Sequence, residues 1–180
     1  MRIKYRIGLL ALALSFTFMS CEEIEELTQI EIDTEVSETV NIVIPDDSLT
    51  NFEGTSTIKL ENSEEMNQYL LDLKDLNVTK ISYKITNYMG PDEGTLSGNL
   101  FFEEMGFELD IPETQLKETS DNEILNTIDA TDEQLDQIAS YLIASKQATL
   151  TARGEVSEAP MEFDFTIIAA LSATAELEKD

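Results

Sequence analysis

The chain of 180 residues carries 37 acidic and 11 basic side chains, which gives a formal net charge of −26. Charge of this sign and density repels phosphate backbones and so excludes nucleic acid as a partner. The sequence contains no histidine, which excludes the Ser/His/Asp relay, the Cys/His pair and histidine-based metal sites. Hydrophobic residues make up 42% of the chain, which predicts a folded domain.

The first twenty residues have the pattern of a secretion signal. Arg2, Lys4 and Arg6 form a basic segment, and residues 7–19 follow without a charged side chain. This apolar run is shorter than the ~17–25 residues that a membrane-crossing helix needs, so the pattern favours a cleaved signal over a permanent span. The run ends at Cys21, the only cysteine of the chain.

The order of basic segment, apolar run, Ser20 and Cys21 resembles bacterial lipoproteins. The resemblance implies a signal peptide at 1–20 and cleavage before Cys21. It also implies that this cysteine carries diacylglycerol and a third acyl chain, which anchor the protein in the outer membrane of the cell envelope. Two or more acyl chains hold a protein stably in a membrane. The alternative is a soluble exported protein whose cysteine has no special role.

Residues 21–29 are expected to form the lipidated cysteine and an acidic tether. Acidic residues directly after the cysteine also resemble the surface-export signals of certain Gram-negative lipoproteins, which implies a surface-exposed protein. Because residues 1–20 carry a charge of +3, residues 21–180 carry −26 − 3 = −29. With Cys21 used as the anchor, the domain at 30–180 has no thiol for a disulfide or a metal.

The first part of this domain alternates between apolar and polar residues, as a half-buried strand does. The pattern predicts a strand over 30–44 that ends at Pro45, and a brief strand over 55–60. Asn62 and Glu65 predict the start of a helix. Its buried face is predicted from helical spacing to be Met66, Tyr69, Leu70, Leu73 and Leu76.

Two strands are predicted next, over 78–88 and 95–103. The turn residues 90–94 between them predict an antiparallel hairpin, with Ile81, Tyr83 and Ile85 inward. A further short strand over 107–111 is expected to end at Pro112.

After a polar loop centred on 120–122, Thr131 and Gln134 form a capping box that predicts a second helix. Its apolar face has helical spacing and consists of Leu135, Ile138, Ala139, Leu142 and Ile143. Strands are predicted over 148–156 and 161–175, separated by a turn at 158–160. The last strand is apolar on both faces, so it is expected to be central and covered on both sides.

The order of elements repeats along the domain. A shift of 69 residues superposes the apolar positions of the first helix and its two following strands on those of the second helix and the last two strands. This favours an internal duplication with pseudo-repeats at about 30–104 and 105–180, unless two similar units fall into register by chance. The predicted fold is α+β: mainly antiparallel β, a sandwich or a strongly curved sheet, with two helices.

The remaining candidates for a site are carboxylates and a few exposed side chains. Clustered carboxylates in loops could bind calcium, although none of these loops has the spacing of an EF-hand. The candidate loops are Asp46/Asp47, Asp92/Glu93, Asp121/Asn122/Glu123 and Asp129/Asp132/Glu133. A glycosidase-like carboxylate pair has almost no support in the sequence. Tyr88 and Phe101 are the aromatic residues expected at the surface. Arg153 is expected to form a surface ion pair.

Two hypotheses for function follow. The first is a non-catalytic, membrane-anchored lipoprotein without a cofactor or metal, which binds an unknown protein through its loops and outer sheet face. The second is a carrier of a small apolar ligand in a cavity beneath the second helix, where small residues are predicted to point inward. These small residues are Ala148, Ala152, Gly154, Ala169, Ala173 and Ala175. They could equally let the helix pack closely on the sheet.

Overall fold

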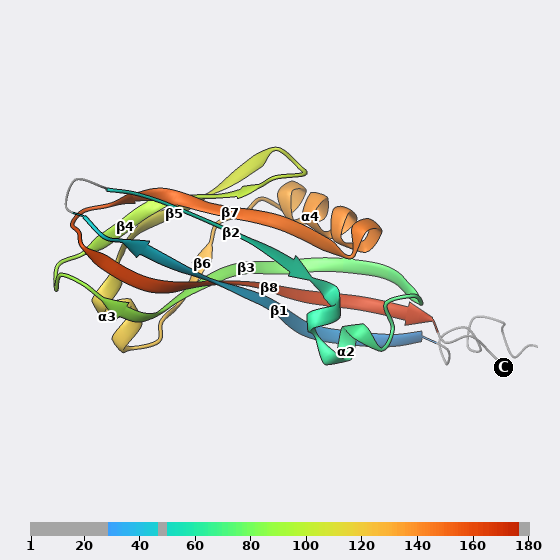
Figure 1. Ribbon diagram of the computed structural model, residues 1–180. Helices are drawn as coiled ribbons and strands as arrows, with labels where there is room; N and C mark the ends of the chain where they lie inside the picture. Colours follow the sequence, from blue (N-terminus) through green and yellow to red (C-terminus); the bar gives the residue numbers. More distant parts are fainter. Residues whose placement is uncertain (1–28, 47–49, 177–180) are drawn as a thin grey trace, which may run out of the picture.

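The computed structural model describes residues 29–46 and 50–176 as two four-stranded antiparallel sheets that face each other (Figure 1). Sheet A has the order β1-β8-β3-β6 and sheet B the order β2-β7-β4-β5. The strands are β1 (Gln29–Ile44), β2 (Asn51–Lys59), β3 (Leu73–Met89), β4 (Thr95–Phe102), β5 (Phe107–Gln115), β6 (Leu125–Ile128), β7 (Gln147–Val156) and β8 (Met161–Glu176). The helices are α2 (Glu64–Asn67), α3 (Leu116–Asp121) and α4 (Asp132–Ser145), with a 3-10 turn at Leu60–Asn62.

Each strand of the first half of the domain pairs with a strand of the second half, in nested order. β1 pairs with β8, β2 with β7, β3 with β6 and β4 with β5, so the chain forms one long antiparallel ribbon. The ribbon curls over, and β8 then also pairs with β3 while β7 pairs with β4. Eight strands in this order form a jelly roll, one of the ways in which a sandwich limits its free sheet edges. The α+β sandwich predicted from the sequence is confirmed.

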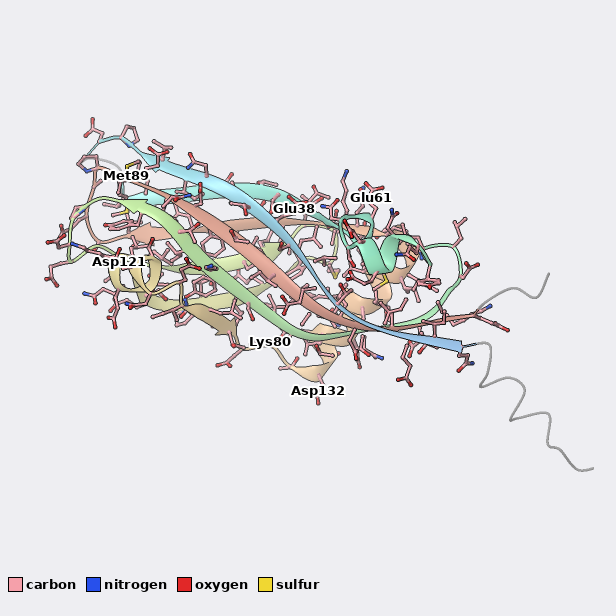
Figure 2. All side chains as sticks on the ribbon, turned by 90° about the horizontal axis from the view of Figure 1, so that it is seen from below. Glu38, Glu61, Lys80, Met89, Asp121 and Asp132 are labelled. Carbon is pink, nitrogen blue, oxygen red and sulfur yellow. The ribbon has the colours of Figure 1, made fainter. Side chains whose placement is uncertain are left out.

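The core lies between the sheets and is built from the alternation of each strand. Ile42 and Ile44 of β1 and Phe163 and Phe165 of β8 are buried, while the residues between them point outward. β8 is central in sheet A, as predicted. Its second face is only half-buried, so the predicted cover on both sides is wrong; no helix lies in front of β8 in Figure 2.

A hydrogen bond in the core joins the two sheets. Tyr83 of β3 is 0% exposed, and its hydroxyl lies 2.5 Å from Oγ1 of Thr114 on β5. Thr114 Oγ1 donates to the carbonyl oxygen of Pro112 at 2.9 Å, so the Tyr83 hydroxyl is the donor to Thr114. The Tyr83 ring stacks on Phe165 at 5.1 Å between centroids. Burial raises the pKa of Tyr83, and the hydrogen bond with Thr114 lowers it by a smaller amount.

The predicted helix over 62–76 is wrong beyond its first turn. α2 has only four residues, and its cap is Ser63, whose Oγ accepts from the backbone of Met66 at 3.1 Å. Leu73 and Leu76 belong to β3, which has β-bulges after Leu73 and after Val78. Each bulge adds one residue, so the inward positions become three residues apart there instead of two. The bulge after Leu73 therefore gives Leu73 and Leu76 the three-residue spacing of a helix.

The predicted hairpin between the strands at 78–88 and 95–103 is also wrong. β3 lies in sheet A and β4 in sheet B, so the turn at 90–94 crosses from one sheet to the other. The hairpin partner of β4 is β5. Consecutive strands pair only as a tendency, and the turn residues of 90–94 are compatible with either path.

The segment after Phe107 differs from the prediction in two ways. β5 continues through Pro112 to Gln115, because it is an edge strand and its proline lies at a bulge, where no ladder hydrogen bond is needed. Ser120 and Asp121 of the polar loop expected around 120–122 are the end of α3, Asn122 is its C-cap, and the unpredicted strand β6 follows. The capping box of Thr131 and Gln134 and the buried face of α4 are confirmed.

The strand order is consistent with the duplication that the sequence suggests. When β1–β4 are exchanged with β5–β8, the order of sheet A becomes that of sheet B. Each half then contains two strands, a helix and two strands, with α2 equivalent to α4, and the second half has the additional helix α3 between β5 and β6. Every jelly roll in this order has the same symmetry, so the duplication of 30–104 and 105–180 stays a prediction.

Candidate interaction faces

The two ends of the described chain lie together at one end of the sandwich, here called the proximal end. Gln29 pairs with Glu176, so the first residue of β1 lies beside the last residue of β8. β1 has 16 residues, so at ~3.3 Å per residue sheet A extends roughly 50 Å to the distal end. The predicted lipid-attachment residue Cys21, the signal peptide and most of the tether lie outside the described residues.

The middle of the outer face of sheet A carries mostly short, uncharged side chains around Ile168. Its outward side chains come from four neighbouring strands and are short, and Thr39 shares a hydrogen bond of 2.8 Å with Thr166. Ser82 is 3% exposed although it points outward. This surface, here called the platform, consists of Ser37, Thr39, Ser82, Thr127, Thr166, Ile168 and Ala170. On β3, Lys80 and Lys84 lie in the rows on either side of Ser82.

Charged residues lie next to the platform on β1 and β3. Glu31, Asp33 and Glu35 are exposed on β1, and Lys80 and Lys84 lie on β3. Lys84 Nζ pairs with Glu123 Oε2 at 2.6 Å. Lys80 is half-buried and forms no ion pair with a described residue; Figure 2 labels it on the strand. The sequence placed these residues on outward faces but gave no reason to single them out.

The distal end of the same face combines a carboxylate cluster with exposed apolar side chains. Asp164 accepts hydrogen bonds from Asn41 at 2.9 Å and from Asn87 at 2.7 Å, and these bonds lower its pKa. Val43 and Met89 both pair with Glu162 from opposite sides and are 56% and 62% exposed.

The outer face of sheet B carries Arg153, and the predicted surface ion pair is confirmed. Arg153 Nη2 lies 3.0 Å from Glu108 Oε2, and its guanidinium lies 4.8 Å from the ring centroid of Phe101. Phe101 is therefore half-buried under the arginine. Tyr88, the other aromatic residue expected at the surface, is also half-buried, and its hydroxyl donates to Pro91 O at 2.7 Å. Neither ring is a free platform for a sugar.

The acidic loops are used for local contacts. Asp92 pairs with Lys117 and Glu123 with Lys84, while Asp132 and Glu133 lie in the first turn of α4, where negative charge is favourable. Within residues 29–46 and 50–176, no three acidic side chains converge in a way that could hold a metal ion. Asp47 lies outside the described residues.

The small residues predicted to line a cavity are packed in the core. Ala148, Ala152, Ala169, Ala173 and Ala175 are all buried. Gly154 lies opposite Gly98, and a Cβ on either residue would come within 2.1 Å of a backbone oxygen of the neighbouring strand. At this pair, glycine serves the close approach of β4 and β7. An open hollow of about 600 Å³ lies beside α4, and it is lined by Met105 and by Glu133, Asp136, Gln137, Ser140, Tyr141 and Ala144 of the helix.

No helix in the described part of the chain is long and apolar enough to cross a membrane.

Comparison with known protein families and with characterised proteins finds no match. Among solved structures, a chain of Desmodium yellow mottle tymovirus is similar, with 10% identity, a TM-score of 0.33 and coverage of 83% of this chain and 85% of that chain. A chain of a virus-like particle of the Macrobrachium rosenbergii nodavirus has 4% identity, a TM-score of 0.35 and coverage of 84% and 96%. Similarity at this level assigns no function.

Proposed function

We propose that the protein is a non-catalytic lipoprotein, anchored in the outer membrane through Cys21, that presents its domain at the cell surface as a binding or scaffold module. The observation that carries the proposal is the position of Gln29. The chain enters the sandwich at the proximal end, eight residues after Cys21, and β1 runs from there to the distal end.

This geometry suits an anchored module. Eight residues at ~3.3 Å each reach about 26 Å, which separates the domain from the headgroups. Residues 21–180 carry −29, so repulsion from anionic headgroups also keeps the domain away from the bilayer. Because the long axis of sheet A starts at the tether, its outer face and the distal loops stay accessible to a partner.

The polar groups with shifted pKa values form contacts that stabilise the fold, which supports a binding role over catalysis. The carboxylates whose pKa is lowered are Glu65, Glu123 and Asp164, and each accepts hydrogen bonds or an ion pair at the surface. The buried Tyr83–Thr114 pair joins the two sheets. These groups stabilise the fold and leave the outer face of sheet A as the surface best suited to contact another protein.

The test is the replacement Cys21→Ala in the full chain. We expect the protein to move from the membrane fraction to the soluble fraction and to lose incorporation of labelled palmitate. The matched control Ser20→Ala keeps a small residue before the cysteine and is expected to stay in the membrane fraction. If Cys21→Ala fractionates as the unaltered chain does, the proposed anchor is wrong.

A further inference from the structure

Exposed apolar side chains gather in the distal half of the outer face of sheet A. Among the described residues, five large apolar side chains are exposed, and three of them point outward from this half of the sheet. Val43 is 56% exposed, Met89 62% and Leu125 45%, and these three residues are here called the distal patch. Single exposed apolar residues are ordinary, whereas several on one face indicate an interaction site.

Two carboxylates without a cationic partner lie beside these apolar side chains. Glu162 lies between Val43 and Met89, and Asp164 is the next outward residue of β8. Two asparagine amides donate to the two oxygens of Asp164, which holds this carboxylate in place. Neither Glu162 nor Asp164 forms an ion pair with a described residue, because Lys84, the lysine of this half of the face, pairs with Glu123 at 2.6 Å.

We propose that the distal patch binds a basic segment of a partner protein. An arginine or lysine side chain of the segment lies at Glu162 and Asp164, and its apolar side chains pack against Val43 and Met89. Charge complementarity selects this partner, because an acidic segment or a second copy of the chain would bring further carboxylates to Glu162 and Asp164. The inference rests on the proposed binding role and names the chemistry of the partner, but it does not depend on the anchor.

The dimensions of the distal patch fit one segment of chain. Val43 and Met89 lie two strand spacings apart, about 10 Å, and Glu162 and Asp164 lie two residues apart on β8, about 7 Å. A guanidinium group reaches a carboxylate with two parallel hydrogen bonds, and the adjoining apolar side chains of the segment cover Val43 and Met89. Because this area is small, the complex is expected to be weak and reversible.

The position of the distal patch leaves it open to a partner. Val43 lies one residue before the end of β1, and Met89 is the last residue of β3; Figure 2 labels it at this end of the molecule. Both lie roughly 50 Å from Gln29, where the chain enters the sandwich. With the proposed anchor in place, the distal patch is on the part of the domain that lies furthest from the anchored end.

The first test measures the binding of a fluorescent peptide to the purified full chain in non-ionic detergent. The probe has about twelve residues, in which leucine alternates with arginine. Fluorescence anisotropy at ~150 mM salt should show saturable binding beyond that to detergent alone. Val43→Ser/Met89→Ser should weaken it about ten-fold or more. The matched control Leu71→Ser should change it little, because Leu71 is 97% exposed but lies in the turn before β3.

Charge variants separate a local site from the general negative charge of the chain. Glu162→Gln should weaken peptide binding by about ten-fold. Glu31→Gln removes the same charge from the proximal half of β1 and should leave binding nearly unchanged. Absence of saturable binding to the unaltered chain, or equal effects of Glu162→Gln and Glu31→Gln, would overturn the proposal. Circular dichroism of each variant checks that the fold is intact.

The second test locates the peptide directly. In the full chain with isotope-labelled methionine methyl groups, the Met89 resonance should shift when the peptide binds, whereas the Met105 resonance should not. Met105 lies with Glu133 and Asp136 in the hollow beside α4, which is the alternative acidic site. A shift of Met105 alone would place the peptide there and refute the distal patch. Neither test involves a membrane, so a negative result leaves the anchor to be decided by Cys21→Ala.

Discussion

The hydrogen bond between Tyr83 and Thr114 gives the sharpest test of how the two sheets are held together. Tyr83→Phe removes only the hydroxyl, and Thr114 keeps its bond to Pro112 O. We expect a loss of about 1 kcal/mol in the free energy of unfolding, the usual net value of one hydrogen bond. Thr114→Val is expected to cost more, about 2 kcal/mol, because it leaves the phenolic hydroxyl buried without a partner.

The double variant separates this interaction from simple loss of packing. With Tyr83→Phe and Thr114→Val combined, neither partner is left unpaired, so the combined loss should be smaller than the sum of the single losses by about 1 kcal/mol. Urea unfolding of the purified chain, followed by circular dichroism, measures all four free energies. The matched control is Tyr69→Phe, because Tyr69 is half-buried and its hydroxyl has no hydrogen-bond partner in the described chain. Strictly additive losses would refute the coupling.

The same residue predicts a pH dependence. The pKa of Tyr83 is raised in the folded chain, chiefly by burial. Its contribution to stability is therefore fully present below the pKa of the unfolded tyrosine, about 10, and is lost as the pH rises through the folded value. Stability should fall above pH ~10, and Tyr83→Phe should reduce this fall.

Three further predictions concern other parts of the sandwich. Gly98→Ala should destabilise the chain by about 1–3 kcal/mol in urea unfolding, because its Cβ would lie 2.1 Å from Arg153 O; a neutral result would contradict the close approach of β4 and β7. Asp164→Asn should cost stability at pH 7 and less at pH 3, because the lowered pKa of Asp164 gives stability that is lost as the pH falls through its folded value. A loss of stability that is the same at pH 7 and pH 3 would contradict this role of the lowered pKa of Asp164. Thr131→Ala should lower the thermal midpoint through a loss of about 0.5–2 kcal/mol, whereas Thr57→Ala on the outer face of sheet B should change it little.

The sequence by itself determined which residues face the core. Alternation in β1, in β7 and in β8 placed the inward side chains correctly, because the two faces of a strand are fixed by local geometry. The capping box of Thr131 and Gln134 located α4 for the same reason, since a cap is made by residues three positions apart. The surface ion pair of Arg153 followed from its place on the polar face of its strand.

The tertiary structure alone decided which strands pair. No local pattern records that β3 joins β8 instead of β4, because the partner lies about 90 residues away and the turn at 90–94 permits either path. The bulge after Leu73 is defined only by the pairing of β3 with β8, and it gives the start of this strand the spacing of a helix. The platform is likewise invisible in the sequence, because β1, β3, β6 and β8 bring its residues together from four distant segments. Local chemistry sets the face of each residue, and only the assembled sheets set its neighbours.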